Sequence, residues 1–205
     1  MKTLIQLPAE FDYNLLLHAL SDYKKPRDKI RGLIKSKDIV RVKKGLYVLG
    51  MEYNKPYNKF VLANLIYGPS YITGQTALAF WNMIPERVEL IFSMTTKRKK
   101  QFETPVGKFS YLYCPKKVFS IGIQLEDTGD QKKILIASPE KALCDFTAAQ
   151  THISTEKEMK EFVELMRLDF SVNRSLDLSL LEEIKTGYRR RSVKLFFNCI
   201  KEDYV

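Results

Sequence analysis

Cationic side chains gathered near the N-terminus are the strongest chemical signal in the sequence. Residues 23–44 contain ten lysines and arginines against two acids, a local charge of +8, whereas the whole 205-residue chain carries +10. Because clustered like charges repel one another, this concentration favours a surface that binds a polyanion over a general role in solubility. The cations expected to contact DNA are Lys24, Lys25, Arg27, Lys29, Arg31, Lys35, Arg41, Lys43 and Lys44.

Two short helices are predicted to position the first of these cations. Asp12 is a predicted N-cap for a helix over residues 13–20, whose apolar side chains recur at helical spacing. Pro26 suits the first position of a second helix, which is predicted to end near Ser36. Its apolar side chains fall on one face, so the cations between them are expected to face outward.

A cationic hairpin is predicted next, from the stretch IVRVKKGLYVLG at residues 39–50. Lys44-Gly45 is expected to form its turn, because glycine tolerates positive φ. Helix, turn, cationic helix and hairpin is the order of a winged helix-turn-helix, whose second helix enters the DNA major groove. The alternative is a solvated basic surface on a small helical hairpin. The apolar side chains expected to hold the hairpin onto its own domain are Val40, Val42, Leu46 and Val48.

A larger unit is predicted beyond a polar connector that follows Gly50. We expect an α+β fold, with a winged helix-turn-helix domain at residues 1–52 and a mixed α/β domain at residues 53–205. Its sheet is expected to be mostly antiparallel and its C-terminal part, about residues 154–203, helical. The predicted strands are 71–73, 88–95, 108–114, 117–124 and 132–137, and a final helix is predicted from about Tyr188.

Two further basic runs are weaker signals. The first follows a predicted strand and is expected to be an exposed loop, which could add phosphate contacts. The second opens the predicted last helix, where cations oppose the helix dipole, so a functional role gains some support. The candidate secondary contacts are Lys97, Arg98, Lys99, Lys100, Arg189, Arg190 and Arg191.

Catalytic and metal-binding patterns are absent from the sequence. The two histidines lie far apart without a nearby ligand cluster, and no glycine-rich phosphate loop or nucleophile motif occurs. Glu140, Lys141 and Asp145 form an acid-base set, but helix capping accounts for the segment better. We therefore expect no catalytic residue, no metal, no cofactor and no enzymatic activity. Three widely spaced cysteines and the lack of a long apolar run predict a cytoplasmic protein without membrane contact.

Several segments together resemble AbiEi-family antitoxins, which belong to type IV toxin–antitoxin and abortive-infection systems. The stretch DYKKPRDKIRGLIKSKDIVRVKKGLYVLG resembles their N-terminal winged helix, and SYITGQTALAFWNMIPE and ILIASPEKALCDF are similar to two downstream blocks. The resemblance spans roughly residues 12–147. It implies a transcriptional repressor that binds the operator of its own operon and opposes a nucleotidyltransferase-like toxin, without a required toxin contact. The implied recognition helix is Arg27–Ser36 and the implied wing is Arg41–Tyr47.

Two departures from the family pattern concern the DNA-binding part. Lys37 stands where the family often has glycine after the recognition helix, and a lysine at positive φ there would be strained. Lys43 and Lys44 stand where arginine is frequent, which favours phosphate over base contacts. Two other functions remain open on the sequence: a ligand-responsive winged-helix regulator with an effector pocket in residues 57–205, and a nuclease targeted by the N-terminal module.

Overall fold

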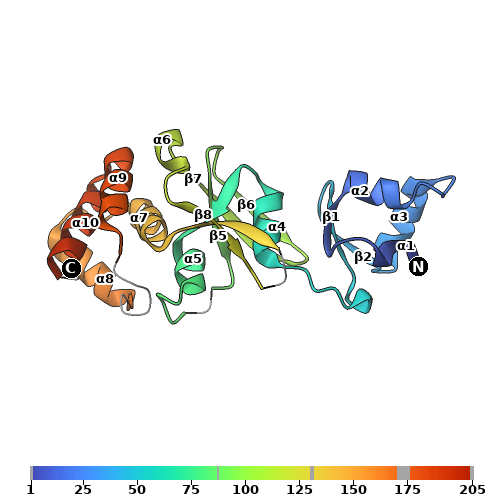
Figure 1. The fold of residues 1–205 in the computed structure, drawn as a ribbon, viewed down its shortest axis with the longest axis horizontal. Helices are drawn as coiled ribbons and strands as arrows, with labels where there is room; N and C mark the ends of the chain where they lie inside the picture. Colours follow the sequence, from blue (N-terminus) through green and yellow to red (C-terminus); the bar gives the residue numbers. More distant parts are fainter. Residues whose placement is uncertain (1, 87, 130–131, 170–175, 204–205) are drawn as a thin grey trace.

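The computed structural model describes residues 2–86, 88–129, 132–169 and 176–203. It has a mixed α+β fold, in which a small N-terminal module is joined by a linker to a larger unit (Figure 1). The module, drawn in blue, lies at one end of the molecule and the C-terminal helices lie at the other. The predicted fold class is therefore confirmed.

The N-terminal module is a winged helix-turn-helix. Its sheet is antiparallel with the order β1-β3-β2. Asp12 caps α2 by accepting a hydrogen bond from the Leu15 backbone at 2.8 Å, and Pro26 opens α3, as predicted. The short α1 and β1 were not predicted. The elements are α1 (Lys2–Ile5), β1 (Glu10–Asp12), α2 (Tyr13–Ala19), α3 (Pro26–Lys35), β2 (Ile39–Lys43) and β3 (Leu46–Leu49).

The hairpin formed by β2 and β3 contributes side chains to two apolar cores. Tyr47 and Leu49 pack with the helices of the module. Val42, Leu46 and Val48 instead belong to the core of the larger unit, and the partly buried Val40 packs against the same core. The expectation that these four hold the hairpin onto its own domain was therefore wrong. Successive side chains on a strand point to opposite faces. All four residues of β3 are buried, so one face of the strand packs on the helices of the module and the other on the larger unit.

The larger unit is built around a six-stranded mixed sheet with the order β6-β7-β5-β4-β9-β8. The pairs β4·β5, β6·β7 and β8·β9 are antiparallel, while β5·β7 and β4·β9 are parallel. The linker begins with η1 (Met51–Tyr53), and Tyr53 packs against the module. The elements of the larger unit up to the end of the sheet are α4 (Lys59–Ile66), β4 (Ser70–Ile72), α5 (Gly74–Phe80), β5 (Ile91–Thr95), β6 (Lys100–Thr104), β7 (Gly107–Tyr113), α6 (Lys116–Phe119), β8 (Ile123–Asp127) and β9 (Lys133–Ala137).

Helix α7 lies between the sheet and the C-terminal helices and contacts α5, α9 and α10. Figure 1 shows α8, α9 and α10 gathered beyond it, at the end of the molecule opposite the winged helix. The expected helical C-terminal part is thus confirmed. The helices are α7 (Pro139–Ala149), α8 (Glu156–Leu165), α9 (Leu178–Tyr188) and α10 (Arg191–Asp203).

The structure differs from the predicted elements at three places. The strand expected at 117–124 begins only at Ile123, because α6 precedes it. The edge strand β6 was missed, since its sequence KQFET carries two charges and lacks an apolar alternation. Residues 178–188 form α9, which lies within the part expected to be helical, so the final helix begins at Arg191 rather than near Tyr188. In the ranges that the structure describes, no helix is long and apolar enough to cross a membrane.

Candidate nucleic-acid interface

Helix α3 presents a stripe of cations on its outward face. Ile30 and Leu33 are 5% exposed and hold the helix against the module. Arg27, Arg31 and Lys35 are exposed and recur every four residues, so they share one face of the helix. Of the nine predicted DNA contacts, Lys43 is half-buried. The other eight are exposed: Lys24, Lys25, Arg27, Lys29, Arg31, Lys35, Arg41 and Lys44.

Contacts within the module leave this stripe available. Arg31 lies 3.6 Å from Asp28, but both side chains are largely exposed, at 84% and 62%. Such an exposed pair contributes at most about 1 kcal/mol, so a phosphate or a base can displace it. Lys29 lies to the side, with its ammonium 5.3 Å from the ring centre of Tyr23. A Cβ built on Gly32 would meet nothing within 4 Å, so the face is open there.

The backbone is strained at the end of α3, as expected from the lysine at a position where the family that the sequence resembles often has glycine. Lys37 has φ 63°, in the left-handed region that favours glycine. Its amide donates to the Ile34 carbonyl at 3.2 Å, which closes the helix. The neighbouring Gly50 lies so close that a Cβ there would stand 2.2 Å from the Lys37 carbonyl oxygen. The Gly50 amide also donates to the Asp38 carbonyl at 2.8 Å. These contacts fix where α3 meets the β2–β3 hairpin.

The wing cations do not share one direction. The strand register shifts between Arg41 and Lys43, and such an irregularity re-aims the side chains that follow. Arg41 and Lys44 are exposed. Lys43 turns toward the larger unit, where its ammonium donates to the Ile66 carbonyl at 2.5 Å. Burial lowers the pKa of Lys43, and the nearby charge of Lys100 lowers it further.

The secondary basic runs have different surroundings. All four cations of the first run are exposed, and Lys100 begins strand β6 rather than lying in the loop. In the second run, Arg189 ends α9 in the left-handed region with φ 52°. The Arg190 guanidinium donates to the Ala148 carbonyl at 2.8 Å and so fastens the α9–α10 junction to α7. Arg191 is exposed at the start of α10.

A buried ion pair holds the centre of the larger unit. Lys141 and Asp145 lie one turn apart on α7 at 2.9 Å, with both side chains fully buried. The second carboxylate oxygen accepts hydrogen bonds from the hydroxyls of Tyr71 and Thr73, each at 2.7 Å. The Tyr188 hydroxyl donates to the first oxygen at 2.5 Å. The pair thereby joins α7 to β4 and α9.

This network has the character of a structural centre. Burial raises the pKa of the Tyr71 and Tyr188 hydroxyls, and the Asp145 charge raises it further, so both remain neutral donors. Both oxygens of Asp145 are already hydrogen-bonded, which leaves little capacity for a substrate. Glu140 accepts from the Asp177 backbone at 3.1 Å, which ties α7 to the start of α9. These contacts favour the structural interpretation of the acid-base set over the catalytic one.

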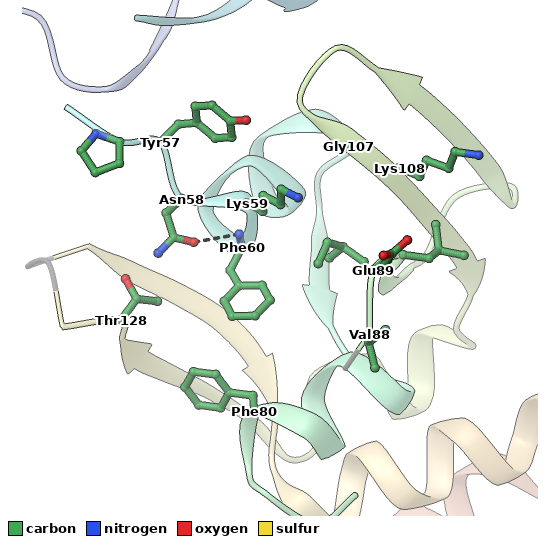
Figure 2. Close-up of a pocket in the computed structure, with 13 residues that line it drawn as sticks. Tyr57, Asn58, Lys59, Phe60, Phe80, Val88, Glu89, Gly107, Lys108 and Thr128 are labelled. Atoms are coloured by element: carbon green, nitrogen blue, oxygen red, sulfur yellow. Dashed lines mark hydrogen bonds between the residues drawn. The ribbon is translucent and has the colours of Figure 1, made fainter. Parts of the chain in front are cut away.

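Among the described residues of the larger unit, an open groove and a smaller, more apolar cavity are candidates for binding a small ligand. The first, about 1010 Å³, is an open groove between the linker, the start of α4 and the β6–β7 turn. Figure 2 shows the charged side chains that line this groove: Lys59, Glu89 and Lys108. The second, about 210 Å³, has a largely apolar lining: Thr73, Gly74, Gln75, Phe92, Met94, Leu112, Asp145, Phe146, Ala149 and Gln150. The residues that the structure describes include no cluster of three metal-binding side chains.

The elements of this chain define a winged helix-turn-helix joined to an α+β unit, and a solved structure shares its fold. No protein-family model matches the sequence, and no curated protein matches it. The structure is similar to that of the RV2827C protein from Mycobacterium tuberculosis, with 12% sequence identity and a TM-score of 0.59. The match covers 95% of this chain and 74% of that one. At this identity the likeness concerns the fold alone.

Two proteins from Helicobacter pylori are similar at a lower level. One is described as a candidate nucleotidyltransferase, with 13% identity and a TM-score of 0.33 over 71% of this chain and 80% of that one. The other is JHP933, with 14% identity and a TM-score of 0.34 over 71% of this chain and 78% of that one. These scores are too low to bear on the function of this chain.

Proposed function

We propose that the protein is a DNA-binding antitoxin that represses its own type IV toxin–antitoxin operon and opposes a nucleotidyltransferase-like toxin. The observation that carries the DNA-binding part is the cationic stripe of Arg27, Arg31 and Lys35 on the outward face of α3. In a winged helix-turn-helix this face enters the major groove. The antitoxin part is supported by the resemblance to AbiEi-family antitoxins.

The geometry suggests a division of labour among the cations. Arg27 and Arg31 each have a planar guanidinium that can bond two acceptors of a guanine at once, so they are the candidates for reading a base. Lys35 lies one turn further along the same stripe. Arg41 and Lys44 lie on the wing and would contact phosphates, which fix the position of the module without reading sequence. The exposed Lys24 and Lys25, which precede α3, would add phosphate contacts on its other side.

DNA binding is tested by the salt dependence of affinity for the DNA upstream of the operon. If six to eight phosphates are neutralised, log K should fall against log salt concentration with a slope of roughly −5 to −7. Fluorescence anisotropy with a labelled duplex measures this slope. An affinity that does not change with salt would rule out the cationic interface.

Variants separate the roles of α3 and the wing. We expect Arg31→Ala with Lys35→Ala to reduce the preference for the operator over unrelated DNA. Lys44→Ala should weaken binding to all duplexes similarly, because it removes a phosphate contact. A matched control removes two cations from α10, Lys194→Ala with Lys201→Ala, which are also exposed. If this control loses operator preference as much as the α3 variant does, the assignment of α3 is wrong.

The antitoxin part requires a different experiment. The toxin of the neighbouring gene is expected to stop the growth of a bacterial host. We expect co-expression of this protein in the cytoplasm to restore that growth. The Arg31→Ala, Lys35→Ala variant should lose repression of an operon reporter and still protect against the toxin, because type IV neutralisation needs no operator. If the parent protein represses the reporter but never protects, the protein is a repressor and the antitoxin proposal fails.

A second candidate function is a ligand-responsive regulator without a toxin. The cavity of about 210 Å³ between α5, α7 and the sheet favours it, because a small ligand site is expected to be concave and largely apolar. A compound bound there should raise the melting temperature of the protein and change its affinity for DNA. If compounds that raise the melting temperature leave DNA affinity unchanged, the cavity does not regulate DNA binding.

A further inference from the structure

The tip of the wing is bonded to the larger unit. Lys43 donates to the Ile66 carbonyl at the end of α4, at 2.5 Å. On the same side of the hairpin, Val42 and Leu46 enter the apolar core of that unit. The wing is therefore seated on the larger unit and does not project freely into solvent. A cation of the larger unit beside this contact therefore lies close to the wing, whose exposed Arg41 and Lys44 are proposed to contact phosphates.

Such cations are present in the loop between β5 and β6 and at the start of β6. Lys97 donates to the Gly68 carbonyl at 2.5 Å, which fixes the base of the loop near the end of α4. The ammonium groups of Lys97 and Lys100 lie 5.4 Å and 5.8 Å from the ring centre of Tyr67. The ring faces attract these cations but carry no net charge, so the positive field of the cluster persists.

The cluster is electrostatically continuous with the wing. The two charged groups that depress the pKa of Lys43, after its burial, are Lys100 and Lys97. Both are cations, so the electrostatic potential around Lys43 at the tip of the wing is positive. Their mutual repulsion would be relieved by an anion that bridges the wing and the loop. A DNA duplex carries one phosphate charge per about 1.7 Å of its axis, which suits such an extended surface.

We infer that the β5–β6 loop is a second DNA-binding element, which contacts the phosphate backbone beside the wing on the same duplex. The inference rests on the proposed DNA-binding function. Lys97 and Lys100 are held by the Gly68 carbonyl and by aromatic rings. Arg98 and Lys99 are exposed at the loop and supply the phosphate contacts. The larger unit thereby adds affinity and lengthens the DNA site without reading additional bases.

The test uses the full-length protein, two operator duplexes and the Arg98→Ala, Lys99→Ala variant. One duplex is limited to the recognition-helix site, and the other extends past the wing by about one helical turn, roughly 10 base pairs. For two lost phosphate contacts, the salt slope on the long duplex should become shallower by about 1.8, and affinity at 0.1 M salt should fall roughly 10- to 60-fold. Affinity for the short duplex should stay the same.

The Lys194→Ala, Lys201→Ala protein serves as the control, because it has the same net charge and lacks two exposed cations of α10. If the loop variant and this control have the same slope on the long duplex, the inference is overturned while DNA binding by α3 stands. An equal loss on the short and long duplexes would also overturn it, since it would show a general charge effect. If the parent binds neither duplex, the proposed function itself fails.

Discussion

Neutralising the buried Asp145 is expected to destabilise the larger unit severely. Asp145→Asn removes the charge that balances Lys141, which is fully buried 2.9 Å away. Breaking one partner of a buried ion pair costs about 3–5 kcal/mol, because the remaining charge stays in the interior without compensation. Tyr71, Thr73 and Tyr188 lose a charged acceptor in the same change. Since whole domains have stabilities of about 5–15 kcal/mol, the loss is a large share.

The assay is urea denaturation followed by the fluorescence of Trp81, the single tryptophan of the chain. Trp81 follows α5 and donates to the Ala137 carbonyl at 2.8 Å, so it reports on the larger unit. A matched control is Glu161→Gln on α8. It also breaks a lysine–acid pair spaced by four residues, but Lys157 and Glu161 are 87% and 64% exposed. Exposed pairs of this kind contribute at most about 1 kcal/mol.

A double variant completes the test. Lys141→Met with Asp145→Asn removes both charges, so it should cost less than the two single changes together by roughly 2 kcal/mol or more. If the two costs add, or if Asp145→Asn is no more harmful than Glu161→Gln, the ion pair is not the centre that holds α7 to β4 and α9. The reasoning from burial would then be refuted.

Three further predictions concern backbone geometry and capping. Lys37→Gly should stabilise the winged helix by roughly 0.5–1 kcal/mol, because glycine adopts the observed φ without strain, and slower hydrogen exchange in α3 would reveal it. Gly50→Ala should destabilise the same module by roughly 1–3 kcal/mol and speed that exchange, since its Cβ would overlap the Lys37 carbonyl oxygen; unchanged exchange would contradict the close approach. Hydrogen bonds from the Ser154 and Thr155 backbone lower the pKa of Glu158. The contribution of ionised Glu158 to stability is therefore present above the ordinary glutamate pKa and is lost as the pH falls through the lowered pKa. Glu158→Gln should make the stability of the larger unit depend less on pH in acid, which denaturation at several pH values measures. An unchanged pH dependence would exclude this role.

The winged helix was predictable because its signals are local. Asp12 and Pro26 mark helix starts, the apolar spacing marks the buried faces, and glycine marks the turn. Even the strain at Lys37 follows from a residue standing where glycine is usual. Such features depend on a few neighbouring residues, so the sequence contains them.

The features that the sequence did not reveal depend on distant contacts. Val42 and Leu46 look like any apolar strand residues, and only the packed structure shows that they join the core of the larger unit. The position of Lys43 on the Ile66 carbonyl depends on a register shift that strand alternation does not predict. Tyr71 and Tyr188 stand 43 or more positions from any part of the Lys141–Asp145 pair, so nothing local links them to it.

The shared hairpin has a consequence for exchanging parts between proteins. Because Val42, Leu46 and Val48 pack with the apolar core of the larger unit, the winged helix does not bury all of its apolar side chains by itself. A chimera that joins only this module to another protein would expose this apolar face. The larger unit of this protein, left without the module, would expose the apolar surface that the hairpin covers. Transplanting the proposed DNA-binding surface therefore requires either moving the β2–β3 hairpin together with α4, or grafting only the outward side chains of α3.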